Sequence, residues 1–328
     1  MLGKTDGAPE TISSRKDAWR GLGTSVPSTY NAEQVLRHGK LGGWNVRKTP
    51  VFTRIDHQDI QIPDRFAVVR DSPHFKGKHD VLGRDVGPEY TVMQNEYMTD
   101  MLDRVVEDAQ GIFSSTADLD GGRKVAVTMQ LPGMAKIGGS DLVDTYLAAM
   151  TSHDGKTGTT FMVTPVHRSS MSTLNLSFKN VPNLFRVKHT RGANRTLAQQ
   201  VKEALEFTYN YLDEFELQAG RLAATKLSQG DFERIITKEF GAPSNAPAPT
   251  ITRTQNKLDL MARLFANKHD EPTGGTAWAG LTALAEWFDH HSHVRPDGGS
   301  EVFARSRRAI FEPGFKNDAL ALMLGLVK

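Results

Sequence analysis

The stretch TLAQQVKEALEFTYNYLDEFELQAGRL, residues 196–222, decides the fold class because the spacing of apolar residues changes there. Within it, apolar residues recur in alternating steps of four and three, the pattern of one face of an α-helix. The members of this seam are Leu197, Val201, Leu205, Thr208, Leu212, Phe215, Ala219 and Leu222. Thr196 and Gln199 form a T-x-x-Q capping box at its start. The stretch therefore predicts one long amphipathic helix.

The chain downstream of this helix also has a helical pattern. The first of the later helices ends at Gly241 and Pro243, which stop a helix. The stretch 242–250 is rich in proline and alanine and is the best linker candidate. We predict further helices over 231–240, 252–267, 276–291 and 317–326.

Upstream of about residue 180 the chain has a different pattern, because β-branched and aromatic residues lie between turn signals. Hairpins are predicted to close at Asp120-Gly121-Gly122 and at Asp154-Gly155, since glycine accepts a positive φ without steric cost. One helix interrupts the strands, with apolar residues at three-to-four spacing over 97–106. The predicted strands are 44–52, 66–70, 78–83, 112–117, 123–131, 144–152, 160–167 and 172–178.

The sequence thus predicts an α+β fold, with a mostly antiparallel sheet region that contains an embedded helix, followed by a helical C-terminal region. We expect residues 1–18 to be a flexible N-terminus and residues 19–190 to form the β-rich region. Residues 191–328 should form the helical region, packed on the first as one unit. The long seam also predicts self-association, because it is longer than one short neighbouring element would cover.

Composition narrows the class of protein. Apolar residues make up 38% of the 328 residues and charged residues 24%, as in ordinary globular proteins. The chain has no cysteine, which excludes disulfides, thiolate nucleophiles and cysteine-type metal sites. It has no run of about 18 apolar residues for a membrane span, and its start is polar. We therefore expect a cytoplasmic protein with no membrane partner.

No motif of a nucleotide-dependent or covalent enzyme is present. The loop Gly155-Lys-Thr-Gly-Thr-Thr160 lacks the upstream glycine of a phosphate-binding loop and joins two predicted strands, so it is typical of a hairpin. A G-x-S-x-G nucleophile elbow is absent from the sequence. We expect no catalytic residue, no cofactor and no nucleotide hydrolysis.

Two groups of potential metal ligands favour structural roles. His290, His291 and His293 lie near a predicted helix end, where imidazoles are favoured by the helix dipole, and no second ligand cluster accompanies them. We predict that these histidines form a solvated helix end without a metal, and metal binding by the cluster is the alternative. Five acids at turns and strand edges show no two-metal spacing. They are Asp64, Asp71, Asp80, Asp85 and Glu89.

The least ordinary feature is a segregation of charge. Residues 155–202 contain no Asp or Glu but eight Lys and Arg, whereas residues 95–120 carry seven acids and one arginine. Clustered bases that lead into a helix N-terminus suit phosphate binding. The alternative is that these bases neutralise acids within the fold or at a subunit contact. The predicted nucleic-acid-binding residues are Lys156, Arg168, Lys179, Arg186, Lys188, Arg191 and Arg195.

Several short segments over about residues 19–325 carry a resemblance to one family. The segments are Trp19-Arg-Gly-Leu-Gly-Thr24, Leu82-Gly-Arg-Asp-Val-Gly-Pro-Glu-Tyr90, Gln94-Asn95-Glu96, Gly121-Gly-Arg-Lys-Val125, Ser152-His-Asp-Gly155, Arg186-Val-Lys-His-Thr190 and Gly275-Thr-Ala-Trp278. In their order and spacing they resemble the phage/plasmid-like family known as domain of unknown function 932. This chain departs from the family's pattern at 169–175, where the resemblance implies a Cys-Asn-Thr-like strand and the chain has Met171-Ser-Thr-Leu-Asn175.

The resemblance implies an origin in a mobile element and no particular reaction. In outline, a hairpin-rich sheet, a basic strip and a long helix are similar to the Rad52/RecT-type single-strand annealing proteins. That likeness implies an ATP-independent homo-oligomer, a ring or filament, that binds single-stranded DNA. The alternatives are a metal-dependent enzyme acting on nucleic acid and an oligomeric interaction protein that does not bind DNA.

Overall fold

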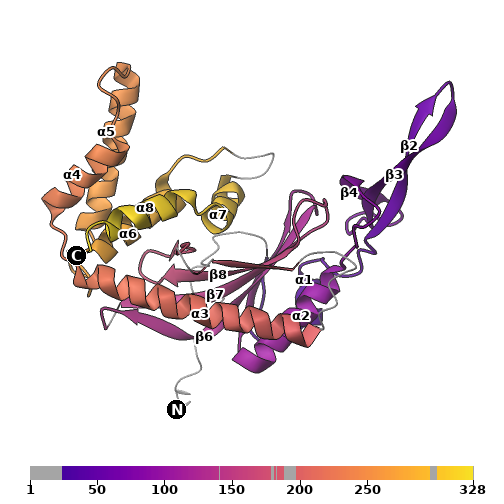
Figure 1. Ribbon diagram of the computed structural model, residues 1–328, viewed down its shortest axis with the longest axis horizontal. Coiled ribbons are helices and arrows are strands. Elements are labelled where there is room, and N and C mark those ends of the chain that lie inside the picture. The colour runs from indigo at the N-terminus through magenta and orange to yellow at the C-terminus, as the bar shows by residue number, and fades with distance from the viewer. Residues whose placement is uncertain are drawn as a thin grey trace, which may run out of the picture. The chain divides into compact units, whose positions relative to one another are not determined.

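A computed structural model describes residues 24–139, 141–178, 181, 183–187, 197–295 and 301–327 (Figure 1). The chain folds into two compact units that alternate along the sequence. Unit 1 comprises Met1–Pro132, Tyr146–Met162 and Leu184–Thr208, and unit 2 comprises Gly133–Thr145, Val163–Asn183 and Tyr209–Lys328. The predicted N-terminal segment 1–18 lies outside the described residues.

The predicted α+β class is confirmed, with an antiparallel sheet and a helical C-terminal region. The main sheet has the strand order β1-β5-β6-β7-β8-β10, and β9 also pairs with β8. Strand β10 was not predicted, since only four residues pair there. The strands are β1 (Thr24–Ser25), β5 (Ile112–Leu119), β6 (Lys124–Ile137), β7 (Asp141–Ser152), β8 (Thr159–His167), β9 (Ser172–Thr173) and β10 (Leu184–Val187).

Both predicted glycine turns are confirmed. Asp120, Gly121 and Gly122 join β5 to β6 with φ values of 54°, 69° and 87°, and Gly155 between β7 and β8 has a φ of 76°. A Cβ at Gly122 would also collide with the guanidinium of Arg70. Glycine is therefore favoured at position 122 by its positive φ, and a larger residue would also displace the Arg70 guanidinium.

A second sheet in unit 1 has the order β2-β3-β4, formed by β2 (Arg47–Ile55), β3 (Gln58–Asp71) and β4 (His79–Val86). Figure 1 shows β2 and β3 as one long ribbon with β4 beside its base. The turn between them is Asp56-His57, where both residues have positive φ, 46° and 67°. The sequence predicted strands only over 44–52 and 66–70, because this turn lacks the glycine or asparagine that identifies a tight hairpin.

Two helices cover part of unit 1. Helix α1 (Ala32–His38) begins with a capping box between Asn31 and Gln34 and was missed because it is short. Helix α2 (Asn95–Ala109) is the predicted embedded helix, and its buried residues include Met98, Met101, Leu102 and Val105.

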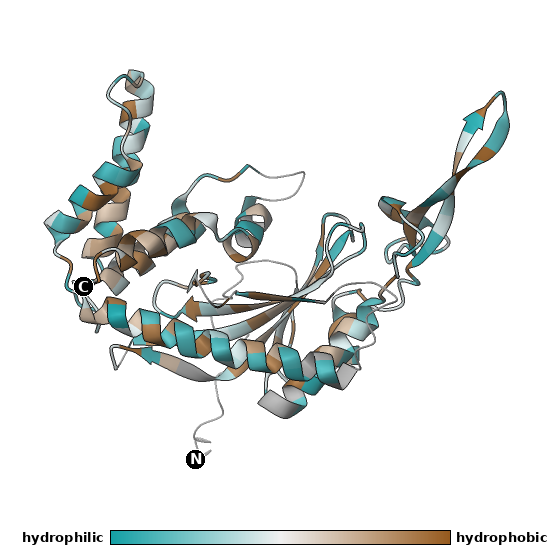
Figure 2. Ribbon diagram, in the orientation of Figure 1, coloured by the Kyte–Doolittle hydropathy of each residue, from teal (hydrophilic) through white to brown (hydrophobic). Residues whose placement is uncertain are grey.

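Helix α3 (Leu197–Ala224) is the predicted long amphipathic helix, and Figure 2 shows hydrophilic and hydrophobic residues alternating along it. Its buried stripe runs through Ala204, Thr208, Tyr211, Phe215, Ala219 and Leu222. The Tyr211 hydroxyl donates to the Leu176 carbonyl at 2.9 Å, and Phe215 packs edge-on against Trp278. Thr208, Phe215, Ala219 and Leu222 of the predicted seam are therefore buried within the chain, and self-association stays a prediction.

The chain after α3 is helical, as predicted, and its helix α6 is buried over Ala277–Ala285. Phe232 and Phe265 stack at 4.3 Å between ring centroids and join α4 to α5. No helix in the described part of the chain is long and apolar enough to cross a bilayer. The elements are α4 (Gln229–Phe240), α5 (Ala248–Ala266), α6 (Ala277–Glu286), the π-helix η2 (Trp287–His291), α7 (Glu301–Phe311) and α8 (Gly314–Leu324).

Candidate functional site

Two of the predicted nucleic-acid-binding residues lie at one end of the main sheet in unit 1. Lys156 is exposed in the turn between β7 and β8, where its backbone N–H donates to Asp154 Oδ1 at 3.0 Å. Arg186 is exposed on β10, and its register partner on β8 is Thr160, four residues after Lys156. Neither side chain forms an ion pair within the described part of the chain. We call this pair the basic edge.

Arg168 in unit 2 has a carboxylate partner. Its Nε and a terminal nitrogen each donate to Asp144 at 3.1 Å, which is the bidentate geometry in which guanidinium binds a carboxylate most strongly. The buried Asp144 is thereby neutralised. This is the pairing within the fold that the alternative interpretation of the basic segment expects.

The remaining predicted binding residues, Lys179, Lys188, Arg191 and Arg195, lie outside the described residues. Thr196, the first residue of the predicted capping box, does too. Lys202, at the start of α3, is exposed and lies 3.8 Å from Glu206 one turn along.

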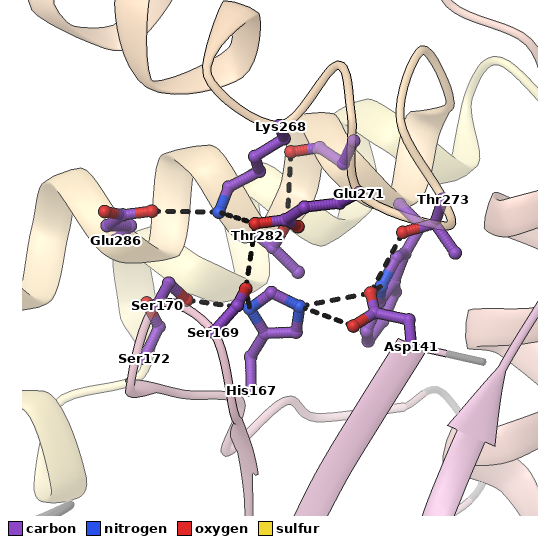
Figure 3. Close-up of polar contacts among 12 residues, drawn as sticks. Asp141, His167, Ser169, Ser170, Ser172, Lys268, Glu271, Thr273, Thr282 and Glu286 are labelled. Carbon is purple, nitrogen blue, oxygen red and sulfur yellow. Dashed lines mark hydrogen bonds and ion pairs between the residues drawn. The ribbon is translucent and has the colours of Figure 1, made fainter. Parts of the chain in front are cut away.

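A buried polar network in unit 2 is the site that sequence reasoning missed (Figure 3). His167, at the end of β8, is fully buried, and Asp141, at the start of β7, is nearly so. The His167 Nε2 atom lies 3.0 and 3.1 Å from the two Asp141 oxygens, and Nδ1 lies 2.8 Å from Ser170 Oγ. An ionised carboxylate only accepts, so Nε2 carries the proton in the contact with Asp141, and Nδ1 shares a second hydrogen bond with Ser170 Oγ.

Asp141 is the anchor of this network, which we call the Asp141 network. Its Oδ2 also accepts from Thr273 Oγ1 at 2.9 Å and from Trp278 Nε1 at 2.7 Å. Burial by itself would raise the pKa of Asp141, but the bonds from His167, Trp278 and Thr273 favour the ionised form and leave its pKa below the usual value. The Asp141 carboxylate, at the start of β7, therefore links the end of β8 to α6 and to the loop that precedes it.

A chain of charged groups continues from the other side of the imidazole. Ser169 Oγ donates to Glu271 Oε1 at 2.9 Å, and Lys268 Nζ lies 3.8 Å from Glu271 and 2.9 Å from Glu286. Lys268 is almost fully buried. Its ammonium group supplies positive charge between two carboxylates, as expected for a buried cation that is stable only with partners.

This arrangement permits two kinds of chemistry in principle. The order Ser170, His167, Asp141 is that of a base-activated serine, but the serine and imidazole are buried and Ser170 Oγ also bonds Ser172 Oγ at 2.8 Å. Asp141, His167 and Glu271 each offer a ligand atom within 4.8 Å of the others, which is a spacing that a metal ion could bridge. Lys268 Nζ lies 3.8 Å from the Glu271 carboxylate in the same group.

Among the described residues, the histidine cluster after α6 is not part of the Asp141, His167 and Glu271 group, and it contacts the network through His290. His290 Nε2 lies 3.0 Å from the Ser170 carbonyl oxygen, where it acts as a donor, while His291 and His293 are exposed. Three of the five acids considered as metal ligands instead pair with arginines. Asp71 pairs with Arg47, Asp80 with Arg70 and Asp85 with Arg65.

A fully buried ion pair lies elsewhere in unit 2. Lys316 Nζ, from α8, is 2.8 Å from Asp289 Oδ1 of η2 and donates to the Ala309 carbonyl at 2.7 Å. Thr173 of β9 contacts both ions, since its hydroxyl bonds Lys316 and its backbone N–H donates to Asp289 at 2.8 Å. Burial lowers the pKa of Lys316, and the Asp289 charge opposes that shift.

Several segments that carry the family resemblance meet in unit 1. The buried Asn95 donates to the Leu41 carbonyl at 2.8 Å, and its Oδ1 accepts from His153 Nε2 at 2.8 Å. Tyr90 donates to the Ser152 carbonyl at 3.2 Å, and burial, with a contribution from Asp154, raises the pKa of Tyr90 to about 12. These motif residues hold α2, β7 and the chain after β4 together.

The sequence contained only a weak signal for the Asp141 network. Trp278 was predicted on a helix face and within a family segment, but its partner is 137 residues away. His167 and Asp141 belong to no local motif, because 26 residues separate them in sequence. Contacts of this kind are set by sheet register, which a single sequence does not display.

Comparison with known proteins identifies the family. No curated protein and no solved structure matches the chain. The model of one family, described as domain of unknown function (DUF932), matches residues 83–310. That range includes the basic edge, the Asp141 network and most of the main sheet, whereas β2 and β3 lie before it, and it spans more than half of the chain. The chain therefore belongs to the DUF932 family.

Proposed function

We propose that the protein binds single-stranded DNA and anneals complementary strands without ATP. The observation that supports this function best is the basic edge, because Lys156 and Arg186 are exposed at the same end of β8 without ion-pair partners among the described residues. They belong to the 48-residue segment that contains no acid. Surface cations of this kind hold a phosphate backbone without reading its bases.

Annealing requires a strand to be held by its backbone while its bases stay available for pairing. A sheet edge with cations and no nucleotide-binding motif suits that task. We propose further that the protein originates in a phage or plasmid and acts in the host cytoplasm as a homo-oligomer. In outline, it would resemble the Rad52/RecT-type annealing proteins. These proposals extend the family assignment, which by itself specifies no reaction.

Replacement of the basic-edge residues tests the binding step. Each phosphate contact to single-stranded nucleic acid contributes about −0.7 to the slope of log affinity against log salt concentration. We expect Lys156→Ala and Arg186→Ala each to weaken binding to all sequences alike and to flatten this slope by roughly 0.7. Fluorescence anisotropy with a labelled oligonucleotide at several salt concentrations measures both quantities.

The matched control is Lys238→Ala, which removes an exposed positive charge from α4 in unit 2. It should leave the salt slope at the wild-type value, and thermal melting should show all three variants folded. If the two basic-edge variants bind as tightly as wild type with the same slope, the basic edge does not contact DNA.

A metal-dependent enzyme acting on nucleic acid is the second candidate. The grouping of Asp141, His167 and Glu271 favours it. Cleavage of an oligonucleotide that requires Mg²⁺ or Mn²⁺ and disappears in a folded Glu271→Gln variant would select this function over annealing. Glu271 suits this test because it is the least buried of the three side chains.

A further inference from the structure

A groove in unit 2 lies where the ends of α3 and α8 meet α4. It consists of two pockets with volumes of about 390 and 530 Å³, which are typical of ligand sites. Lys226 and Leu326 line both pockets, so the two are continuous. We call the two pockets together the α4 groove, and all of its lining residues belong to unit 2.

Helix α4 forms one wall of the groove. Its lining residues follow one another at steps of three, one and three, which places them on a single face of the helix. They are Asp231, Arg234, Ile235 and Lys238. Glu233 and Glu239, the other acids of α4, line neither pocket. The face of α4 that borders the groove is therefore richer in cations than the helix as a whole.

Positive charge dominates the lining of the groove. Four cations, Arg221, Lys226, Arg234 and Lys238, stand against one acid, Asp231. That acid already pairs with Arg234. Lys226 and Lys238 are exposed, and neither has an ion-pair partner in the part of the chain that the structure describes. The groove thus offers ammonium groups that a ligand's anionic groups could neutralise.

Apolar side chains form the rest of the groove. Leu227 is only 5% exposed and lies at its floor, while Ile235, Leu326 and Val327 are half-buried. A simple anion would cover the cations and leave this apolar surface in water, which is unfavourable. The groove therefore suits a ligand that carries anionic and apolar groups side by side.

This combination favours a peptide over a nucleic acid. Single-stranded nucleic acids are held by cations together with aromatic rings on which their bases stack. Neither pocket is lined by an aromatic residue. An extended peptide places successive side chains on opposite sides. Alternating acidic and apolar residues would thus direct carboxylates to the cations of the rim and apolar side chains to the floor.

We propose that the α4 groove binds an acidic peptide segment of a partner protein, in which carboxylate side chains alternate with apolar ones. Lys226 and Lys238 would hold the carboxylates, and Leu227 and Ile235 would contact the apolar side chains. The proposal goes beyond the proposed function and does not depend on it, since the basic edge belongs to unit 1.

The test uses a fluorescein-labelled octapeptide of alternating aspartate and leucine, with binding followed by fluorescence anisotropy. The wild type should bind it at micromolar concentration. Lys226→Ala and Lys238→Ala should each weaken binding by about tenfold, because each removes a charge-assisted contact. Arg263→Ala, which removes an exposed cation of α5 that lines neither pocket, should bind like wild type. Lys226→Arg, which keeps the charge, should retain most of the affinity.

Control ligands separate charge from apolar contact. An octapeptide of alternating serine and leucine, and one of alternating lysine and leucine, should bind much more weakly than the acidic peptide. Absence of binding by the wild type, or equal affinity for the acidic and serine peptides, would overturn the proposal. Equal affinity of all four variants for the acidic peptide would overturn it too.

A nucleic acid as the occupant is a separate outcome. An unlabelled single-stranded oligonucleotide that displaces the acidic peptide from the wild type would assign the groove to nucleic acid and contradict the peptide proposal. We expect no displacement, and we expect Lys226→Ala and Lys238→Ala to bind the oligonucleotide as the wild type does. Loss of peptide binding with DNA binding intact therefore distinguishes the groove from the basic edge.

Discussion

Replacing Lys316 with alanine should lower the free energy of unfolding by about 3–5 kcal/mol, the cost of removing one partner from a buried ion pair. The change leaves Asp289 buried without its ammonium partner at 2.8 Å. It also removes donors from Ala309 and Asn175, which join α7 and the segment after β9 to α8. Urea denaturation followed by far-UV circular dichroism measures the loss.

Lys238→Ala is the control for this experiment, since Lys238 is an exposed lysine in the same unit. It should change the free energy of unfolding by no more than about 0.5 kcal/mol. A loss of less than 1 kcal/mol for Lys316→Ala would mean that the buried pair does not join α8 to η2.

Replacing Asp141 with alanine should lower the free energy of unfolding by at least about 3 kcal/mol near neutral pH. The carboxylate accepts from His167, Thr273 and Trp278, and each buried donor left without an acceptor costs about 1–3 kcal/mol. Chemical denaturation at pH 7 measures this loss.

The same variant should change the dependence of stability on pH. The folded-state pKa of Asp141 is lower than its unfolded value of about 3.9. The ionised carboxylate thus stabilises the fold above that unfolded value, and this contribution is lost as pH falls through the folded pKa. Asp141→Ala should lose less stability than wild type between pH 5 and pH 2. Asp213→Ala, which removes an exposed carboxylate from α3, should follow the wild-type curve, and identical curves for all three proteins would contradict the role of Asp141.

Much of the fold was predictable because local signals were strong. The change of apolar period after residue 196 located α3, and glycines at positive φ located the β5-β6 and β7-β8 turns. The β2-β3 hairpin was not predictable from turn chemistry, since Asp56 and His57 adopt left-handed conformations without glycine. The stripe of α3 was predicted only in part, because Ala204 and Tyr211 are buried in positions that the seam assigned to Leu205 and Leu212.

The functional residues were less predictable than the elements. Charge composition drew attention to Lys156 and Arg186, which the structure places at one sheet end, but it could not reveal that Arg168 pairs with Asp144. Asp141 and His167 gave no signal, because their contact depends on how distant segments pack rather than on spacing in the chain. Composition therefore indicated a class of partner, while tertiary packing determined which charges stay available.

Strand annealing itself tests the central claim most directly. Two complementary oligonucleotides, one with a fluorophore and one with a quencher, are mixed with the protein in EDTA and without nucleotide. The proposed function predicts that the wild type accelerates quenching well beyond the protein-free rate, and that the double variant Lys156→Ala/Arg186→Ala loses most of this acceleration while remaining folded. Quenching at the protein-free rate with folded wild type at micromolar concentration would contradict the proposed function.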